Sequence, residues 1–258
     1  MVLKPDALAG KLAVVTGGSR GIGRAAAIEM AKAGAKLVLT ARTAAACEAA
    51  AEAVRAAGGA VASLHGFDVA DVAATEAFAA EVQRRHGAVD ILVNNAGVGT
   101  LGTVEAMAPE ELERMLAINV VGPYTLIRAL LPAMLARKAG VIINITSARA
   151  NMPAAGYGAY CASKAGLMAL GRCLALELDG TGVRMVGFSP GFTATDMLDD
   201  LYSPQNVHLA AIPASAAHPP QRPARIIAWL ATDAAADLAG REIGIQWNDI
   251  TLRAGLEG

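Results

Sequence analysis

The sequence predicts an α/β fold in which about seven parallel strands form one doubly wound sheet with helices on both faces. Short apolar runs alternate with longer helical patterns along the chain, and such alternation requires crossover connections between parallel strands. The apolar runs are continuous rather than alternating, as expected where both faces of a sheet are covered. A chain of 258 residues suits one large α/β domain, so we expect residues 1–258 to form a single domain.

The expected elements follow one another in strand–helix order. The apolar runs predict strands at Leu12–Thr16, Lys36–Ala41, Val61–Asp68, Ile91–Asn94, Val141–Thr146, Val183–Ser189 and Glu242–Gln246. Between them, helical patterns cover Ile22–Ala33, Ala44–Ala57, 72–85, 109–137, Tyr157–Leu178 and Pro223–Ala231. Pro123 and Pro132 lie inside the longest pattern, and each removes a backbone donor, so a kink is expected at each.

Residues 191–222 interrupt this order. The segment carries prolines at 204, 213, 219 and 220, and apolar residues near its start. A long irregular insert in a compact domain is usually a lid or a disordered segment. We therefore expect residues 191–222 to form a substrate-binding lid within the domain.

The composition argues against several classes of partner. The formal net charge is −1 and no long basic stripe is present, so we expect no nucleic acid partner. The apolar stretches are broken well short of the ~18 residues that a membrane span needs. The N-terminus lacks the basic-then-apolar order of a signal peptide. We therefore expect no membrane partner and a cytoplasmic location.

Cysteine and histidine usage gives no sign of a metal or of a disulfide framework. The three cysteines are sparse and odd in number, which argues against structural disulfides. The four histidines show no metal-ligand spacing. We expect no metal site.

A glycine-rich turn follows the first expected strand, at residues 16–23 with the sequence TGGSRGIG. Gly17, Gly21 and Gly23 allow a tight turn, a close backbone approach and a helix that begins beside the strand. The helix N-terminus then presents free N–H groups and a positive dipole end to a pyrophosphate. A plain loop between strand and helix is the alternative, but the position near the N-terminus favours a dinucleotide-binding turn.

The spacing of these glycines resembles that of the short-chain dehydrogenase/reductase family, a family with a Rossmann-type fold. In this family an acidic residue at the end of the second strand favours NAD. Ala41 stands at that position, followed by Arg42, and Arg20 lies within the glycine turn. Two guanidinium groups without a competing carboxylate suit a 2′-phosphate. The resemblance therefore implies NADP(H), the alternative being two solvated surface arginines.

The resemblance extends to other segments that hold the cofactor. Asp68 and Val69 match the pair that holds the adenine edge, although Asp68 could instead cap a helix, a role that Asp71 could also fill. Small residues at 94–97 allow close backbone approach, and Asn94 is expected to hold neighbouring strands together. The cofactor contacts implied are Gly17, Ser19, Arg20, Gly21, Ile22, Gly23, Arg42, Asp68, Val69, Asn95, Ala96, Gly97, Tyr160, Lys164, Pro190, Gly191, Thr193 and Thr195.

Tyr160 and Lys164 are four residues apart, which places them on one face of a helix, one turn apart. A free tyrosine has a pKa near 10, and a nearby ammonium would favour the phenolate and lower that pKa. The pair could therefore serve as a tunable acid and base. On spacing alone, a solvated helix face remains the alternative.

Two further residues complete the expected catalytic set. Ser147 lies at the carboxyl end of the fifth expected strand, where open α/β sheets bind ligands, and its hydroxyl could hold a substrate oxygen. In the family, an asparagine in the context of Asn119 supports a water that relays protons to the lysine. Alternatively, Asn119 is only a polar residue beside a helix irregularity. The resemblance implies catalysis by Asn119, Ser147, Tyr160 and Lys164.

The expected function is hydride transfer between NADP(H) and a carbonyl or alcohol, with a ketone or an acyl thioester as substrate. A non-catalytic NADP(H) sensor on the same fold is the alternative. Substrate contacts are expected from Met197, Leu201 and Tyr202, and Arg149 could meet an anionic group. Relatives associate through their two long helices, so a homo-oligomer is expected, a tetramer or a dimer.

Overall fold

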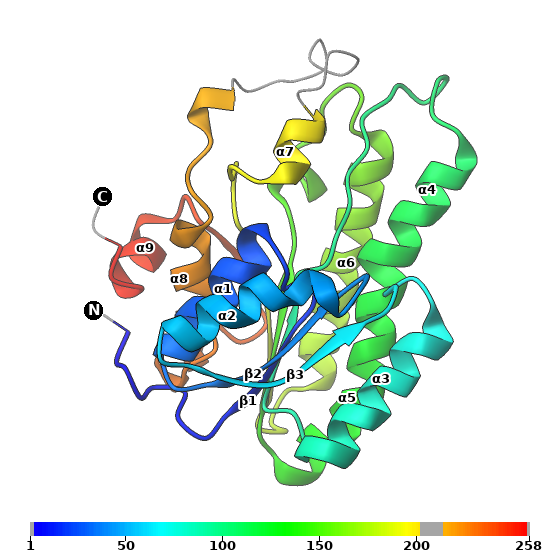
Figure 1. Cartoon of the computed structure of the whole chain (residues 1–258). Helices are drawn as coiled ribbons and strands as arrows, with labels where there is room; N and C mark the ends of the chain where they lie inside the picture. Colours follow the sequence, from blue (N-terminus) through cyan, green and yellow to red (C-terminus); the bar gives the residue numbers. More distant parts are fainter. Residues whose placement is uncertain (1–2, 202–213, 257–258) are drawn as a thin grey trace.

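The computed structural model describes residues 3–201 and 214–256, and they form the predicted doubly wound architecture (Figure 1). A seven-stranded sheet has the order β3-β2-β1-β4-β5-β6-β7, and every strand pair in it is parallel. The strand order reverses between β1 and β4, which lie side by side. In such sheets, ligands bind outside the carboxyl ends of the strands at this reversal.

The observed elements match the predicted ones closely. The strands are β1 (Leu12–Val15), β2 (Lys36–Ala41), β3 (Ala60–Gly66), β4 (Ile91–Asn94), β5 (Gly140–Ile145), β6 (Val183–Ser189) and β7 (Glu242–Gly244). The α-helices are α1 (Gly21–Lys32), α2 (Glu48–Ala56), α3 (Val72–His86), α4 (Pro109–Leu116), α5 (Gly122–Arg137), α6 (Gly158–Glu177), α7 (Asp196–Leu201), α8 (Gln221–Leu230) and α9 (Asn248–Arg253). The last strand ends two residues before the predicted Gln246, because the chain turns where Trp247 N–H bonds to Gly244 C=O.

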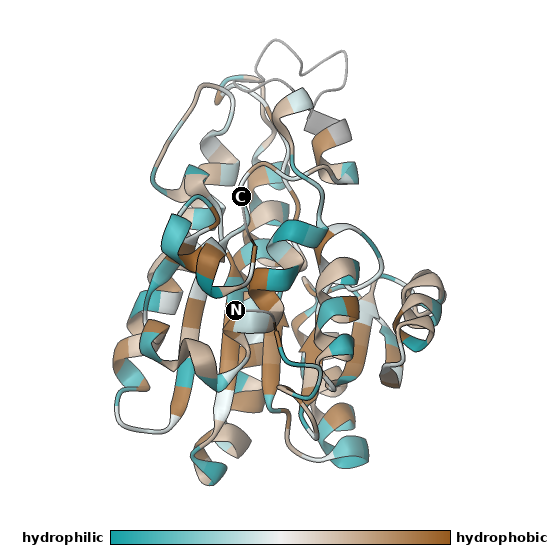
Figure 2. Ribbon diagram, turned by 90° about the vertical axis from the view of Figure 1, so that its left-hand side faces the viewer, coloured by the Kyte–Doolittle hydropathy of each residue, from teal (hydrophilic) through white to brown (hydrophobic). Residues whose placement is uncertain are grey.

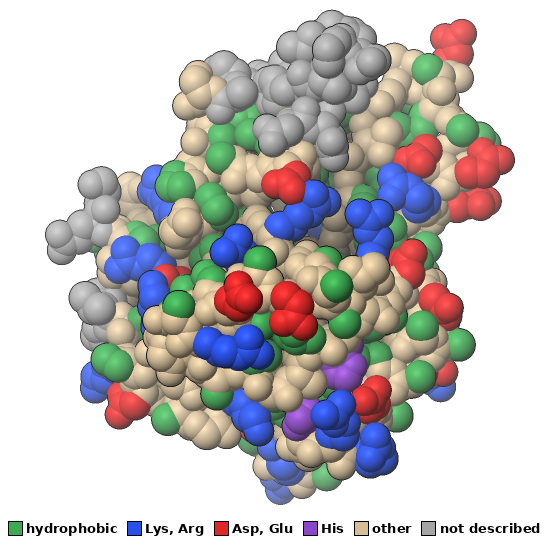
Figure 3. Space-filling view, in the orientation of Figure 1, with side chains coloured by type: hydrophobic (Ala, Val, Ile, Leu, Met, Phe, Trp, Pro, Cys, Tyr) green, Lys and Arg blue, Asp and Glu red, His purple; other side chains and the backbone are tan. Residues whose placement is uncertain are grey.

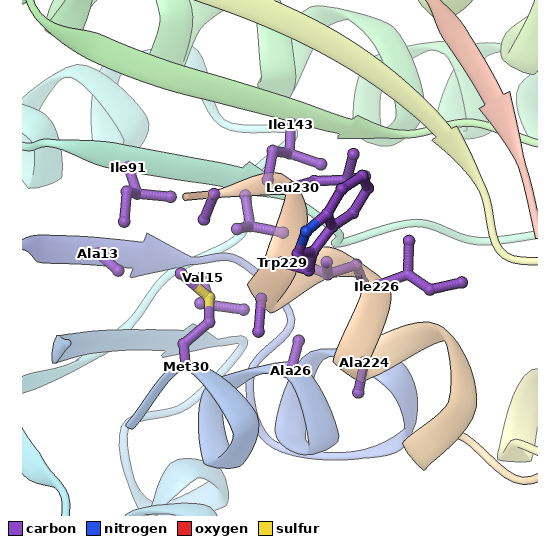
Figure 4. Close-up of a cluster of buried hydrophobic side chains, with 14 of the residues drawn as sticks. Ala13, Val15, Ala26, Met30, Ile91, Ile143, Ala224, Ile226, Trp229 and Leu230 are labelled. Atoms are coloured by element: carbon purple, nitrogen blue, oxygen red, sulfur yellow. The ribbon is translucent and has the colours of Figure 1, made fainter. Parts of the chain in front are cut away.

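Helices cover the sheet on both faces (Figures 1 and 2). On one face, α1 packs against α8, and Met30 and Trp229 meet strand residues such as Val15 and Ile143 in a buried cluster (Figure 4). On the other face, α3, α5 and α6 enclose a second apolar cluster. The hydropathy pattern in Figure 2 follows this layering, with apolar strands beneath helices that are polar on their outer side.

The longest helical stretch contains a wide turn. Residues Ala117–Val121 between α4 and α5 are π-helical, directly before Pro123. Helix α5 continues through Pro132 to Arg137. The irregularity expected near Pro123 is therefore present as a π-helical turn, whereas Pro132 does not end the helix.

This stretch, Pro109–Arg137, has a mean hydropathy of 1.4 over its most apolar window, and it is long enough to cross a membrane. Gly122 and Arg128 interrupt its apolar run, as the sequence analysis expects, so only its length and mean hydropathy are those of a membrane span. Within the fold, 44% of that window is buried and α5 packs against α3. Core helices of globular proteins have the same length and composition.

The glycine turn approaches the end of β4 so closely that no side chain fits between them. A Cβ atom on Gly23 would lie 2.3 Å from the Gly17 carbonyl oxygen and 2.4 Å from Asn95 Nδ2. Gly17 itself has φ +62°, in the left-handed region that glycine adopts most readily. The start of α1 is thus fixed against β4 by backbone contact.

We expect Gly23→Ala to lower the free energy of unfolding by about 2 kcal/mol or more, because backbone atoms would have to move to admit a methyl group. Urea unfolding measures the change. The matched control is Gly166→Ala in α6, where the added Cβ would lie 3.4 Å from Val120 Cγ2 in ordinary contact. The control should be neutral or stabilised by about 0.5–1 kcal/mol. Equal effects of the two substitutions would contradict this interpretation of the turn.

Candidate active site

A cavity of about 1320 Å³ opens at the carboxyl ends of the strands. Its volume exceeds the ~300–1,000 Å³ of most small-molecule sites, so a cofactor and a substrate could share it. Lys and Arg side chains gather around a hollow in the upper half of the face shown in Figure 3. The predicted site residues that line the cavity are Gly17, Ser19, Arg20, Gly21, Ile22, Arg42, Asp68, Val69, Asn95, Ala96, Gly97, Ser147, Arg149, Tyr160, Lys164, Pro190, Gly191, Thr193, Thr195 and Met197.

Two predicted site residues lie behind the cavity wall. Two others cannot be placed at the cavity, because the structure does not describe their side chains. Gly23 supports the turn from behind, and Asn119 is fully buried. Tyr202 lies outside the described residues, as does the side chain of Leu201. Within the expected lid, residues 191–195 are irregular and Asp196–Leu201 form α7.

Hydrogen bonds fix the glycine turn to the end of β4. The Asn95 side-chain amide donates to Thr16 C=O at 2.9 Å and to Gly17 C=O at 3.3 Å. The Thr16 hydroxyl accepts from the backbone N–H groups of Asn95 and Ala96. No side chain caps the N-terminus of α1, so its N–H groups face the cavity without a side-chain acceptor. An anionic group could take that place.

The two arginines expected at the 2′-phosphate differ in their partners. Arg20 forms an ion pair with Asp196, the first residue of α7. This ion pair links the glycine turn to the start of α7. Arg42 has no ion pair among the residues that the structure describes. Both arginines are exposed at the cavity. Arg42 is therefore the guanidinium better placed to accept a phosphate without losing another partner.

Asp68 and Asp71 divide their roles as the sequence suggests. The Asp71 carboxylate caps α3 by accepting from Ala74 N–H at 3.0 Å. Asp68 accepts from Ala70 N–H at 2.9 Å and lines the cavity. The helix cap is therefore Asp71, and Asp68 remains at the cavity wall.

The Tyr160 phenol lies deep in the cavity wall beside Ser147. Burial is the main influence on Tyr160 and raises its pKa, whereas a hydrogen bond with Ser147 acts in the opposite direction. The expected lowering of this pKa by Lys164 was therefore wrong, because burial outweighs the effects that lower it and Lys164 is not among them. The Lys164 ammonium lies 6.0 Å from the ring centroid and bonds elsewhere. A protonated phenol is a proton donor, so this environment favours Tyr160 as an acid.

Lys164 is buried, and its Nζ donates to the Ile145 carbonyl at 2.9 Å. Burial lowers the Lys164 pKa from its ordinary value of 10.5 to about 8. The group can therefore lose and regain a proton near neutral pH, as a proton relay requires. One helical turn separates it from Tyr160, as the spacing predicts.

Asn119 sits in the π-helical turn and bonds in two directions. Its amide donates to Val98 C=O and to Ser163 Oγ, each at 2.9 Å, and its Oδ1 accepts from Val98 N–H at 2.9 Å. Both amide hydrogens are thus used within the protein. Its side chain therefore links three parts of the fold: the π-helical turn, the segment that follows β4, and α6. π-Helical turns are often found at functional sites.

The segment after β6 forms the cavity wall opposite the glycine turn. Gly191 has φ +71°, and Thr193 pairs with His218 in an isolated bridge. Ser189 stands before Pro190 and lines the cavity, where its buried hydroxyl has no hydrogen-bond partner among the described residues. An incoming ligand could supply that partner.

Two contributions to the site escaped the sequence analysis. The Glu242 carboxylate at the start of β7 accepts from Thr146 Oγ1 at 3.1 Å, next to Ser147. Burial raises the pKa of Glu242, and the bond from Thr146 opposes this effect. Ser163, which binds Asn119, was also missed. Ser163 lies directly before Lys164 in the segment that was singled out, but its bond to Asn119 spans 44 residues. At Glu242, a charged residue that opens an apolar strand was the visible signal.

Among the residues that the structure describes, no group of three or more His, Cys, Asp or Glu side chains could hold a metal ion.

Asn94 donates to Asn144 at 2.9 Å, so the predicted link between neighbouring strands is confirmed. The site thus consists of a cofactor-sized cavity, a buried acid and base pair, and several arginines.

Known proteins resemble this chain over most of its length. The family model for short chain dehydrogenases matches residues 11–206. The 3-oxoacyl-[acyl-carrier-protein] reductase FabG of Escherichia coli (strain K12) is 36% identical over 237 residues, which cover 92% of this chain and 96% of that protein. A metagenomic short-chain oxidoreductase crystallised with NADP is 39% identical, with a TM-score of 0.77 over 92% of this chain and 98% of that one. A gluconate 5-dehydrogenase from Beutenbergia cavernae, putative in its description and with NADP bound, is 32% identical, with a TM-score of 0.85 over 94% and 97% of the two chains.

The buried ammonium of Lys164 gives a stability prediction with a defined pH dependence. Because its folded pKa of about 8 lies below the ordinary value of 10.5, folding below pH 8 removes a charge from water. Below about pH 8, Lys164 is charged in both the folded and the unfolded chain, and the loss of free energy of unfolding is greatest. This loss decreases as the pH rises from about 8 to 10.5. We expect Lys164→Met to raise the free energy of unfolding by about 2 kcal/mol at pH 7, after deduction of the lost hydrogen bond.

Urea unfolding at several pH values between 7 and about 10.5 measures this effect, and the gain should shrink across that range. Lys32→Met is the control, since Lys32 is an exposed partner of Glu29 and its removal should change stability by less than ~1 kcal/mol. A Lys164→Met protein that is less stable than the parent at pH 7 would contradict the prediction, as would a gain that does not vary with pH.

Proposed function

The chain belongs to the short-chain dehydrogenase/reductase family, and on that premise we propose that it is an NADP(H)-dependent oxidoreductase acting as a ketone or 3-oxoacyl reductase. The observation that carries the proposal is the convergence of Ser147, Tyr160 and Lys164 on one cavity with the glycine turn. Ser147 is close enough to Tyr160 to lower the pKa of its phenol. The proposed acid Tyr160, the proposed proton relay Lys164 and the glycine turn thus line the same cavity.

The residues at the cavity fit NADP(H). The uncapped N-terminus of α1 suits a pyrophosphate, and Asp68 with Val69 lines the wall where an adenine would lie. Arg42 follows the end of β2 without a carboxylate partner in the described part of the chain, which suits a 2′-phosphate. The unpartnered Ser189 hydroxyl could bond the carboxamide end, together with the segment from Pro190 to Thr195.

The proposed mechanism assigns each side chain one task. Ser147 and Tyr160 hold the substrate oxygen, and the Tyr160 phenol gives it a proton. When bound, NADPH supplies the hydride to the carbonyl carbon. Lys164 returns a proton to Tyr160, for which its lowered pKa is suited. Asn119 keeps the π-helical turn against α6 and so fixes the surroundings of Lys164. Alcohol oxidation follows the same path in reverse.

A non-catalytic NADP(H) sensor is the alternative of another class. Such a protein would keep the glycine turn but would not need a buried Lys164 beside a protonated Tyr160. Burying an ammonium destabilises a fold, and a group with so shifted a pKa in a cleft is typical of a catalytic site. The catalytic proposal is therefore favoured.

Assembly and location complete the proposal. Apolar side chains remain exposed on the long helices, with Val121 and Leu135 at 39% and 37% and Leu176 at 81%. A second copy of the chain could cover them, which supports a homo-oligomer, a tetramer or a dimer. The described cysteines are all free, in keeping with a cytoplasmic, reducing location. Nucleic acid is not expected as a partner of this nearly neutral chain.

Tyr160→Phe tests the proposed chemistry. Removal of the phenolic hydroxyl should lower kcat for carbonyl reduction by about 10²-fold or more, because the proton donor is lost. NADPH oxidation, followed by absorbance against a panel of ketones and acyl thioesters, measures the rate, and NADPH fluorescence measures binding, which should persist. Tyr124→Phe is the control, since Tyr124 is 52% exposed outside the cavity. A folded Tyr160→Phe enzyme with parental kcat would exclude this mechanism.

Ala41→Asp combined with Arg42→Ala tests the cofactor assignment. The new carboxylate would repel a 2′-phosphate and accept from a 2′-hydroxyl, while the guanidinium is lost. We expect the ratio of kcat/KM with NADPH to that with NADH to fall by about 100-fold, the scale of a charged hydrogen bond plus a repulsion. Retention of the parental ratio would mean that the ribose pocket lies elsewhere.

A further inference from the structure

The charged side chains that line the cavity do not balance one another. The arginines are Arg20, Arg42, Arg114 and Arg149. Arg20 pairs with Asp196, and Arg114 pairs with Glu111 at 3.0 Å. Within the described residues, Arg42 and Arg149 have no carboxylate within 4.0 Å. The proposed function assigns a ligand to Arg42, the 2′-phosphate. It assigns no ligand to Arg149.

Arg149 is held by neutral groups, and no carboxylate whose side chain the structure describes pairs with it. It lies in the short helix Ala148–Ala150, directly after Ser147, whose Oγ accepts from Arg149 N–H at 3.2 Å. The guanidinium carbon lies 4.6 Å from the centroid of the Tyr157 ring, and that ring is only 7% exposed. Nη1 donates to Met152 C=O at 3.2 Å. The ring and the carbonyl orient the guanidinium but carry no negative charge.

The cofactor phosphates cannot serve as the missing counter-ion. The glycine turn follows β1, whereas Arg149 follows β5, and β4 lies between them. With ~4.8 Å between neighbouring strands, the two sites are roughly 10 Å apart. Arg149 instead lies on the catalytic side of the cavity, and its charge is close enough to act on Tyr160. An anion that binds Arg149 in the cavity would therefore belong to the substrate rather than to the cofactor phosphates.

We propose that Arg149 is a specificity-determining residue that binds a carboxylate of the substrate, so that the preferred substrate is a short oxo acid. This inference rests on the proposed function and names the substrate class for it. Only one residue separates Arg149 from Ser147, which places the carboxylate within a few bonds of the reacting carbonyl. A planar guanidinium binds a carboxylate in bidentate fashion, which would fix the carbonyl against Ser147 and Tyr160. The carboxylate is unchanged in the reaction, in which the carbonyl carbon gains a hydride and its oxygen a proton.

The substrates for the test are matched pairs: 2-oxobutanoate, 3-oxobutanoate and 4-oxopentanoate, each beside its methyl ester. The parent enzyme should show kcat/KM at least about tenfold higher for one or more of the acids than for its ester, because a charged hydrogen bond is worth that factor or more. Arg149→Gln should lower kcat/KM for that acid by about 10- to 100-fold, mainly through KM, with under about threefold change for the ester. Arg149→Lys should retain part of the preference, since it keeps the charge but loses the fork.

Arg128→Gln is the matched control, because Arg128 is 65% exposed and pairs with Glu76 on the outer surface. It should leave both kinds of substrate unaffected. A parent enzyme that reduces esters as well as acids would overturn the inference while leaving the proposed function intact. Equal losses on acid and ester in Arg149→Gln would also overturn it and indicate a structural role on Tyr157. If no carbonyl compound is reduced at all, the proposed function fails first, and the inference fails with it.

Discussion

The short distance between the ends of β1 and β4 is the constraint on which the rest of the site depends. The Asn95 amide bridges two carbonyls of the turn, and the Thr16 hydroxyl accepts two backbone N–H groups in return. Each such bond contributes only ~1 kcal/mol net, but each unmade one would leave a polar group unsatisfied at greater cost. The network therefore admits one arrangement, with glycine at 23 and the start of α1 aimed at the crevice.

Several features that lower the stability of the fold lie at the same edge of the sheet as Tyr160 and Lys164. A buried ammonium, a half-buried phenol and a π-helical turn all lie where α4, α5 and α6 meet the ends of β4 and β5. None of these features helps the chain to fold, because each removes a polar group from water or departs from regular helix geometry. The two large apolar clusters on the two faces of the sheet provide the stability that makes them tolerable. Stability and function are thus divided between the body of the sheet and its carboxyl edge.

The sequence predicts the fold well because its signals are local. Apolar runs, helical periodicity and the glycine turn depend on neighbours in the chain, and the seven strands were all located from them. The parts of the site that could not be predicted depend on partners far away in the sequence. Arg20 meets Asp196 across 176 residues and Thr146 meets Glu242 across 96. The direction of the Tyr160 pKa was misjudged for a related reason: helical spacing gives the distance to an ammonium, whereas burial depends on the whole fold. A π-helical turn has no sequence signature that separates it from a proline kink.

The distribution of arginines along the cavity divides recognition between its two ends. Arg42 is exposed after β2, and in the proposed complex it would discriminate between cofactors by the presence of one phosphate. Arg149 is half-buried and fixed on a buried aromatic ring, so little side-chain entropy remains to be lost when it binds. A fixed cation beside the proton donor selects by position as well as by charge, because an anion bound there leaves the carbonyl few orientations. In the proposed complex the same cation would also favour the negative charge that develops on the substrate oxygen during hydride transfer. One residue can therefore couple the choice of substrate to the rate of its reduction.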